Sequence, residues 1–323
     1  MRRLRVHAMS GTVGFCTIIG RLTRAGPGYT ARASKEGTLR SRLIGIVAAL
    51  AVFGLIVAAC GEEETPGGGG TATTAPAFES ELITSGVLTV GSCLDYKPFE
   101  WVAQGDQKGF DVDLTEEIAR RLGLKVDWIT ANFNTIFTAV AGHKFDMVAA
   151  AVTATGDTGE ERAQTVSFSS FYYNSRQSMA VNPDARPDLT STDQLGNGDS
   201  VGVQKGTTGK AWAEENLAPK GVEIRTYTAA PDAFRDLQAG RVDAVINDEP
   251  ASAVIVTDFP PTKVVQAIDT NEKYALAFAK DTPNLLAAVN QAMADIVEDG
   301  TYEKIYAKYF PGAPVPEEFQ PST

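Results

Sequence analysis

The sequence is poor in the two residue types that most often bind transition metals. Its 323 residues include two histidines, His7 and His143, and three cysteines, Cys16, Cys60 and Cys93. Beyond residue 60 only His143 and Cys93 remain, so this part of the chain cannot form a disulfide bond within itself. A zinc site built from histidine and cysteine needs more such ligands. We therefore expect no metal ion, no cofactor and no catalytic histidine.

Positive charge is also scarce in this part of the chain. Residues 1–59 carry nine Lys and Arg and one acidic residue, which leaves 20 Lys and Arg against 39 Asp and Glu from residue 60 onward, a net charge of −19. Nucleic-acid affinity comes mainly from basic residues that neutralise phosphates. The composition therefore excludes nucleic acid as the expected partner, while the length allows two globular domains.

The N-terminal region contains an uncharged segment, residues 43–59, preceded by Arg40 and Arg42. A basic stretch followed by an apolar stretch is typical of a secretory signal segment. Small residues end this segment directly before Cys60, which resembles a bacterial lipobox and implies that Cys60 is lipidated. The alternative is a single spanning helix, because seventeen apolar residues are just long enough to cross a bilayer.

The segments on either side of this apolar stretch have different expected roles. Residues 1–38 are long for a basic leader, so we expect translation to begin nearer Leu39. Residues 61–77 consist of Gly, Thr, Pro, Ala and acidic residues, with no large apolar side chain. Such a composition cannot fold and predicts a flexible tether over 60–77. The expected location is the outer face of the cell membrane, reached through a lipid anchor.

The stretch from Phe145 to Tyr173 most strongly suggests a ligand site. It begins with an apolar run, Asp146–Val152, that predicts a buried parallel strand. Small and hydroxyl-bearing residues follow, then a polar loop and Arg162. A guanidinium offers two parallel donors to a carboxylate and keeps its charge. The segment therefore predicts a grip on a small carboxylate, with a surface arginine after a loop as the alternative.

Strand and helix patterns alternate before this stretch. The predicted elements are a strand at Val87–Ser92, a helix after Gly109, a strand at Leu124–Thr130 and a helix at Asn132–Ala141. Asp113 and Glu116 have the spacing of a capping box, so we expect Asp113 to cap the first helix. Strand–helix repeats followed by a further strand predict a parallel sheet with right-handed crossovers.

A second alternation follows an extended run at Arg176–Asn182. Its predicted elements are strands at 200–204, 222–227, 242–247 and 273–279, and helices at 206–216, 231–239, 249–256, 284–298 and 302–309. The helix that opens at Gly206–Gly209 offers free N–H groups to an anion, without the spacing of a nucleotide-binding loop. Asp248, directly after an apolar strand, is expected to meet a cation, to cap the next helix, or to do both.

A set of short motifs follows in order along residues 78–312. They are Gly91, Tyr96–Glu100, Gly109–Leu114, Phe145, Asp146, Thr153, Arg162, Phe168, Ser169, Tyr172, Tyr173, Val201–Thr208, Gly240–Ala244, Asp248 and Asp299–Tyr302. Together they resemble the polar amino-acid-binding proteins of ABC importers, which belong to solute-binding protein family 3 and have the type II periplasmic binding protein fold.

The resemblance implies an α/β fold of two lobes, each a mainly parallel sheet flanked by helices, with two hinge crossings. Lobe 1 would comprise residues 78–179 and 270–323, and lobe 2 residues 180–269. The implied function is that of a binding protein rather than an enzyme. It would capture an L-amino acid between the lobes as a monomer and deliver it to an ABC permease in the membrane.

The resemblance also implies how the two charges of an amino acid are bound. Arg162 would pair with the α-carboxylate, helped by the backbone of Thr208 at a helix start. Asp248 would bind the α-ammonium together with Thr153 and the carbonyl of Ala150. Because these groups come from both lobes, ligand binding should favour the closed form.

The side chain of the ligand would meet a different set of residues. Tyr96 and Phe133 would enclose it, and Gln204 and Asn247 would face the pocket. Cys93 stands where several relatives have an aspartate that meets the distal group of the ligand. The loss of that charge, with neutral Gln204 and Asn247 nearby, favours a neutral polar amino acid such as glutamine.

Other functions are expected to share this fold. An enzyme such as a dehydratase acting on a cyclic acid needs a positioned acid or base in the cleft, and Asp95 and Glu100 are the available carboxyls. A sensor that docks to a receptor kinase or a channel would bind its ligand in the same way. Neighbouring permease and ATPase genes would separate the sensor from the transport receptor.

Overall fold

The computed structural model describes residues 76–322 of the chain. The predicted signal segment, Cys60 and almost all of the predicted tether lie outside these residues. Within the described range, no helix is both long and apolar enough to span a bilayer.

Strands and helices alternate along residues 76–322. The strands are β1 (Val87–Ser92), β2 (Asp95–Tyr96), β3 (Glu100–Ala103), β4 (Asp106–Lys108), β5 (Lys125–Thr130), β6 (Met147–Val148), β7 (Ser167–Val181), β8 (Ser200–Gln204), β9 (Glu223–Tyr227), β10 (Ala244–Asp248) and β11 (Lys263–Phe278). The α-helices are α1 (Phe110–Leu122), α2 (Phe133–Ala141), α3 (Gly156–Ala163), α4 (Thr208–Asn216), α5 (Ala230–Gln238), α6 (Glu249–Ile255), α7 (Pro283–Glu298) and α8 (Thr301–Tyr309).

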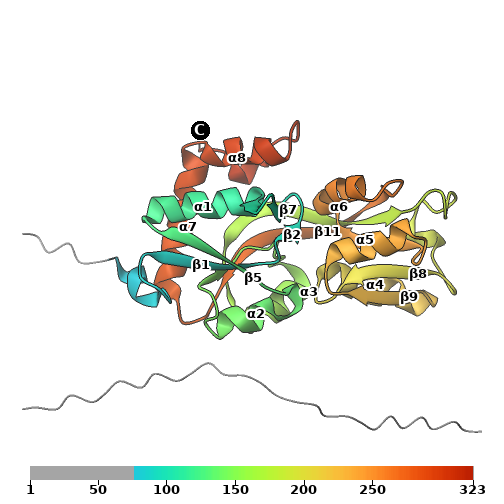
Figure 1. Ribbon diagram of the computed structural model, residues 1–323, viewed down its shortest axis with the longest axis horizontal. Helices are drawn as coiled ribbons and strands as arrows, with labels where there is room; N and C mark the ends of the chain where they lie inside the picture. Colours follow the sequence, from blue (N-terminus) through green and yellow to red (C-terminus); the bar gives the residue numbers. More distant parts are fainter. Residues whose placement is uncertain (1–75, 323) are drawn as a thin grey trace, which may run out of the picture. The chain divides into compact units, whose positions relative to one another are not determined.

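One large sheet runs through this part of the chain, in the order β5-β1-β6-β11-β7-β10-β8-β9 (Figure 1). β1 pairs in parallel with β5 and β6, and β8 pairs in parallel with β9 and β10. The predicted α/β class and the parallel pairing of the strand–helix repeats are therefore confirmed. We call β1, β5 and β6 with their helices the first half, and β8, β9 and β10 with α4, α5 and α6 the second half.

The long strands β7 and β11 lie between the halves and run antiparallel to each other. The end of β7 pairs with β10, through Gln177–Val181, whereas the end of β11 pairs with β6, through Ala277 and Phe278. The chain therefore passes between the halves inside two hydrogen-bonded strands. Their register slips between Ile268 and Glu272. The residue boundaries given above for the two lobes stay a prediction.

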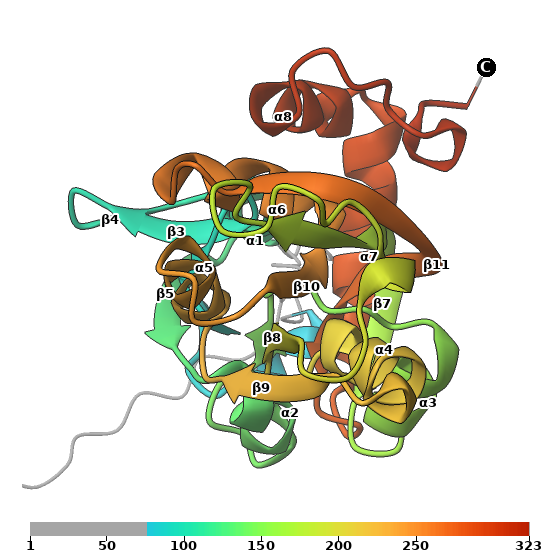
Figure 2. The same cartoon turned by 90° about the vertical axis from the view of Figure 1, so that its right-hand side faces the viewer.

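Helices cover both faces of the sheet. α1 and α2 lie on opposite sides of β1 and β5 (Figure 1), and α4 and α5 lie on opposite sides of β8 (Figure 2). Successive strand residues point to opposite faces, so Val245 of β10 packs in the cluster that contains Phe234 of α5. Its neighbour Ile246 packs in the cluster that contains Ala213 of α4. Each half thereby buries apolar side chains on both faces.

The strand predicted at Asp146–Val152 is shorter in the structure, where β6 spans Met147–Val148. Beyond it the strand pairing is interrupted at Ala151, which has a left-handed backbone with φ of 48°, and only an isolated bridge joins Thr153 to Tyr274 of β11. The Ala151 N–H donates to the Asp111 carboxylate, at 2.9 Å, instead of to a neighbouring strand. The chain after β6 is therefore free to line a cavity.

The polar loop predicted before Arg162 is a helix, α3. Gly159 and Arg162 are its buried residues, so the sequence shows no apolar repeat from which a helix could be predicted. Because Arg162 lies in the last turn, its side chain has a fixed direction. The prediction of a loop was wrong, and the helix fixes the guanidinium in place.

The predicted capping role of Asp113 was also wrong. Helix α1 begins at Phe110 with Gly109 as its N-cap residue, so Asp113 lies inside the helix, where it accepts from Lys308 at 2.6 Å. A side chain at Gly109 would meet the Phe99 carbonyl oxygen at 1.8 Å. That close approach, at a φ of 140°, requires glycine and places the helix start earlier.

A small antiparallel sheet of β2, β3 and β4 was not predicted. Its strands are too short to show a periodic pattern. β2 and β3 pair with Tyr96 opposite Glu100, so this sheet fixes both residues at the edge of the first half.

Candidate functional site

The structure contains a cavity where the two halves meet. We call it the central cavity. The residues that line it are Cys93, Asp95, Tyr96, Glu100, Phe133, Ala150, Ala151, Thr153, Arg162, Gln204, Thr207, Thr208 and Asp248. The eight residues predicted to bind the ligand, Tyr96, Phe133, Ala150, Thr153, Arg162, Gln204, Thr208 and Asp248, are all among them. The structure thus brings together side chains separated by up to 152 positions in the sequence.

Arg162 is buried at one side of the central cavity, with 7% of its surface exposed. Its Nη1 donates to the Thr153 carbonyl at 2.6 Å, and its Nη2 donates to the Gly206 carbonyl at 2.9 Å. The guanidinium also lies over the rings of Phe133 and Phe137, 5.3 Å and 4.9 Å from their centres. The alternative of a surface arginine is therefore wrong. The side chain connects segments of both halves.

Burial lowers the pKa of Arg162 to about 10, against the opposing effect of Asp248 and Glu272. The group still carries its positive charge at neutral pH. The hydrogen-bond acceptors that it contacts here are two neutral carbonyls, so a buried guanidinium in this position favours an anionic ligand group.

Asp248 is a buried carboxylate at the end of β10. It accepts from the Tyr96 hydroxyl at 3.0 Å, from the Tyr274 hydroxyl at 2.6 Å and from the Gln177 amide. Its pKa is raised to about 6, mainly by burial and next by Glu272, while the three donors act in the opposite direction. Asp248 stands at the N-cap position of α6 but makes no side-chain capping bond. The carboxylate faces the central cavity rather than its own helix.

Glu272 of β11 organises the hydroxyl groups between these two charges. It accepts from Thr153 at 2.6 Å and from Thr208 at 2.8 Å, so its carboxylate connects the first half with the start of α4. The Gln177 amide donates to both Glu272 and Asp248. Glu272 and Gln177 were not among the residues predicted for the site. Gln177 lies inside the extended run predicted at Arg176–Asn182, and Glu272 directly precedes the strand predicted at 273–279. Nothing else in the sequence marks either residue.

Cys93, Asp95, Glu100 and Gln204 border the other side of the central cavity. The Arg162 side continues into a groove lined by Phe137 and Lys210, whereas Cys93, Asp95 and Gln204 also line a separate groove. Arg162 is the one basic residue among the lining residues in the described part of the chain. This second side of the cavity is therefore acidic.

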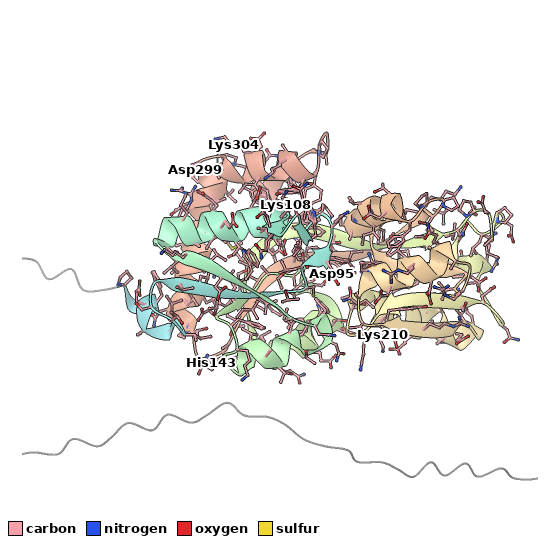
Figure 3. The ribbon with its side chains drawn as sticks, viewed as in Figure 1. Asp95, Lys108, His143, Lys210, Asp299 and Lys304 are labelled. Atoms are coloured by element: carbon pink, nitrogen blue, oxygen red, sulfur yellow. The ribbon has the colours of Figure 1, made fainter. Side chains whose placement is uncertain are left out.

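The carboxyls on the acidic side have raised pKa values. Burial raises the pKa of Asp95 to about 6, with a further contribution from Asp232 of α5. Burial raises the pKa of Glu100 well above its usual value, followed by the effects of Asp111, Asp95 and Asp248. The Cys93 thiol is also raised in pKa, mainly by burial. Asp95 lies on β2, between the two halves of the molecule (Figure 3).

The other predicted residues have different surroundings. Phe133 is the first residue of α2, and Gln204 ends β8 and donates to the Thr228 carbonyl at 3.2 Å. Asn247 does not line the central cavity. It is buried beside it, where its Oδ1 shares the Tyr96 hydroxyl with Asp248, at 3.1 Å, and its Nδ2 donates to Ser252 at 3.2 Å. Its expected place in the pocket was wrong, because its amide contacts Tyr96 and Ser252 and does not line the cavity.

Comparison with known sequences gives a consistent result. The family described as bacterial extracellular solute-binding proteins, family 3, matches residues 88–312. The histidine-binding periplasmic protein of Salmonella typhimurium is 31% identical over 234 residues, which are 69% of this chain and 87% of that protein. The lysine/arginine/ornithine-binding periplasmic protein of Escherichia coli is 32% identical over 234 residues, with the same coverage.

Three solved structures of ancestral proteins have the same fold. An ancestral arginine-binding protein bound to arginine has a TM-score of 0.65 and 34% identity, covering 70% of this chain and 98% of that chain. An ancestral arginine-binding protein bound to glutamine has a TM-score of 0.65 and 35% identity, with 70% and 99% covered. An ancestral amino acid-binding protein described as a precursor of cyclohexadienyl dehydratase has a TM-score of 0.64 and 35% identity, with 70% and 96% covered.

Proposed function

This chain belongs to the bacterial extracellular solute-binding proteins of family 3, and from that premise we propose that it captures one L-amino acid in the central cavity and presents it to an ABC importer. The observation that carries the proposal is the presence of Arg162 and Asp248 in one cavity. A buried cation and a buried anion across a small space are complementary to the two charges of an amino acid.

The α-carboxylate pairs with the guanidinium of Arg162 in this proposal. A guanidinium has five N–H donors, and two of its nitrogens here already contact backbone carbonyls. The remaining donors are available to a carboxylate. The N-terminus of α4 at Thr208 adds free backbone N–H groups and a favourable helix dipole.

The α-ammonium binds to Asp248 in this proposal and replaces the hydrogen bond from the Tyr96 hydroxyl to that carboxylate. Tyr96 of the first half now donates to Asp248 of the second half. An ammonium between them offers three donors, one of which suits the Ala150 carbonyl and another the Thr153 side chain. Because the ligand bridges the halves, it stabilises the form in which they are closed around it.

The side chain of the ligand extends between Tyr96 and Phe133 toward the acidic side of the cavity. The neutral residues Cys93 and Gln204 favour a carboxamide, as in glutamine, whereas Asp95 and Glu100 favour a guanidinium or an ammonium. All of these ligand groups are N–H donors. We propose an amino acid whose side chain ends in such donors, a class that includes the ligands named for the relatives described above.

Membrane attachment through Cys60 is a separate part of the proposal. Its support is the sequence around Cys60, with small residues before it and a tether after it. Metabolic labelling with a radioactive fatty acid is expected to label the wild-type chain but not the Cys60→Ser variant. Equal labelling of both would reject this anchor.

Calorimetry against the twenty amino acids tests ligand capture. We expect binding by a subset with N–H donors at the end of the side chain, and a loss of at least about 100-fold in affinity in Arg162→Ala, because a charge-assisted bidentate contact disappears. Lys205→Ala, on the neighbouring groove, is the control and should bind normally. No binding to any amino acid at millimolar concentration would contradict the proposed function.

A second candidate is a dehydratase on the same fold. Its support is the buried Glu100 with its raised pKa, a property of catalytic acids, together with the structural likeness to a dehydratase precursor. Incubation of the protein with a cyclohexadienyl carboxylic acid, followed by absorbance of an aromatic product, tests it. Turnover that disappears in Glu100→Gln would favour the enzyme over the binding protein.

A further inference from the structure

Glu100 differs from Asp248, the other buried carboxylate that lines the central cavity, because both of its oxygens lack a partner. The side chain is 1% exposed, and neither Oε1 nor Oε2 has a hydrogen-bond partner among the described residues. Asp248, by contrast, accepts from three donors. A buried carboxylate without donors or a counter-ion is strongly unfavourable in its charged form.

The groups that surround Glu100 make this charge still less favourable. The titratable groups that interact with it are Asp111 of α1, Asp95 and Tyr96 of β2, Asp248 of β10, Tyr172 of β7 and the Cys93 thiol. Each of these groups is neutral when protonated and negatively charged when deprotonated, and none is basic. Arg162 is on the other side of the cavity and does not contribute to this set.

Glu100 and Asp111 are buried neighbours, and of the two Asp111 is the one that carries the negative charge. Its Oδ2 accepts from the Ala151 N–H at 2.9 Å and from the Tyr172 hydroxyl at 2.8 Å. Hydrogen bonds to the charged form stabilise it, and Glu100 has no equivalent donors. Of the two neighbours, Asp111 is therefore the one that ionises first and Glu100 the one that keeps a proton.

We propose that Glu100 carries a proton while the central cavity holds no cation, and releases it when an amino acid with a guanidinium or ammonium side chain binds. The proton leaves the Glu100 carboxyl for the solvent, and the carboxylate then pairs with the ligand cation. An amide ligand does not require this step, because the protonated Glu100 hydroxyl donates to the amide oxygen. The inference rests on the proposed function.

This exchange makes ligand preference depend on pH. Releasing a proton becomes easier as pH rises, so affinity for a cationic ligand increases with pH, by up to about tenfold per unit while Glu100 is protonated in the free protein. Affinity for an amide ligand stays level or falls. The preference of the cavity therefore shifts from ligands with an amide side chain toward ligands with a cationic side chain as pH rises.

Isothermal titration calorimetry of arginine and glutamine in buffers of different ionisation enthalpy measures this proton directly. At about pH 7.5, we expect arginine to release more protons than glutamine, up to one per molecule bound. Both ligands carry the same α-ammonium, so any proton released at Asp248 cancels in the comparison. Asp95 is mostly ionised at this pH, because its pKa is about 6.

The variants Glu100→Gln and Asp95→Asn separate the two acids on this side of the cavity. In Glu100→Gln the difference in released protons is expected to disappear, and the affinity for arginine to lose its dependence on pH. In Asp95→Asn the difference should remain. Infrared difference spectra of the ligand-free wild type and Glu100→Gln give a second measurement, in which a protonated carboxyl band should be present in the first and absent from the second.

Each outcome decides between the two proposals. Arginine binding with no more proton release than glutamine, or a free protein without the protonated carboxyl band, overturns the role of Glu100 and leaves ligand capture intact. Failure of both ligands, and of every other amino acid, to bind overturns the proposed function and this inference with it. A retained difference in Glu100→Gln assigns the proton to another group and also overturns the inference.

Discussion

At the scale of single residues, the central cavity keeps two acidic side chains apart with one amide. Gln177 is fully buried, and the two N–H groups of its Nε2 point to Asp248 and to Glu272, the latter at 2.9 Å, with the Thr208 hydroxyl 3.1 Å away. Asp248 and Glu272 raise each other's energy when both are charged, as the pKa of Asp248 shows. The neutral donor between them is therefore part of what allows both carboxylates to stay buried.

The variant Gln177→Glu tests this role. It replaces the shared donor by a third carboxylate, and we expect it to lower the free energy of unfolding by about 3 kcal/mol or more at neutral pH. Gln177→Met, which removes the donor without adding charge, is the control and should cost less. Denaturant titrations of both variants measure the difference, which should shrink below about pH 5 as carboxyls become protonated. Equal losses in the two variants would contradict this account.

Glu100 gives the folded protein a dependence on pH. Its pKa is raised from the usual 4.5, so between that value and the raised one the folded state binds more protons than the unfolded state. Stability is then complete below about pH 4.5 and is lost as pH rises toward the folded-state value, by about 1.4 kcal/mol per unit.

Glu100→Gln should therefore melt at a higher temperature than the wild type at about pH 7.5, and show little gain at about pH 4.5. Thermal melts followed by circular dichroism across this range measure the effect. Glu303→Gln, on the exposed face of α8, is the matched control and should follow the wild type. A gain in Glu100→Gln that does not change with pH would contradict the assignment.

At the scale of elements, segments with a local periodic pattern could be predicted from the sequence, whereas segments defined by tertiary contacts could not. β1, β8, α2 and α7 agree with their predicted ranges to within a residue or so, because their periodic patterns and end signals are local. The first part of β11, from Lys263, was missed. Its residues are mostly half-exposed, so the strand is defined by pairing with β7 rather than by its own pattern.

The candidate site could be predicted to a similar extent. Arg162, Asp248 and the neighbouring threonines were predicted, because sequence motifs and charged residue types can be recognised without a structure. Glu272 was missed, since nothing in the sequence shows that β11 passes between the halves beside β7. The importance of Glu100 was also missed, because a missing partner is a property of three-dimensional packing.

Helix α3 provides a prediction at this scale. A side chain at Gly159 would come within 2.3 Å of the Ala154 carbonyl carbon, and backbone atoms cannot move aside. Alanine normally stabilises a helix relative to glycine by about 1 kcal/mol. Here we expect Gly159→Ala to lower the melting temperature, to displace Arg162 one turn further on, and to weaken amino-acid binding more than tenfold.

The exposed position Glu160 in the same helix gives the control. Glu160→Ala changes a neighbouring residue without entering the contact with Ala154, so its melting temperature and ligand affinity should stay near those of the wild type. Calorimetry and thermal melts of the two variants side by side test the close approach. Normal ligand binding by Gly159→Ala would show that α3 accommodates the added methyl group without displacing Arg162, and would contradict this prediction.

At the scale of the whole molecule, the halves are held together around the cavity by a few polar contacts. Besides Tyr96 with Asp248 and Arg162 with Gly206, an ion pair joins Lys97 of the first half to Asp258 of the second at 2.7 Å. Both side chains of this pair are partly exposed, so its contribution is small and sensitive to salt.

Lys97→Ala is expected to raise the Kd of the amino acid about twofold at low salt, because the closed form loses about 0.5 kcal/mol. The effect should vanish at high salt, and the double variant with Asp258→Ala should be no weaker than either single one. Lys308→Ala breaks an ion pair with Asp113 that lies within the first half and is the control. Calorimetry at two salt concentrations decides; a salt-independent loss would point to another cause.

The slipped register between β7 and β11 has a consequence for redesign of this protein. One of the four irregularities of this pairing falls between Ile268 and Glu272, opposite Gln177 and Ser175, at the place where the chain passes from one half to the other. We therefore expect the same few positions to affect both the twisting of the β7–β11 pair and the hydrogen bonds to the polar groups of a bound ligand. Substitutions chosen to alter selectivity there will also change the opening rate, so recognition and stiffness cannot be tuned independently.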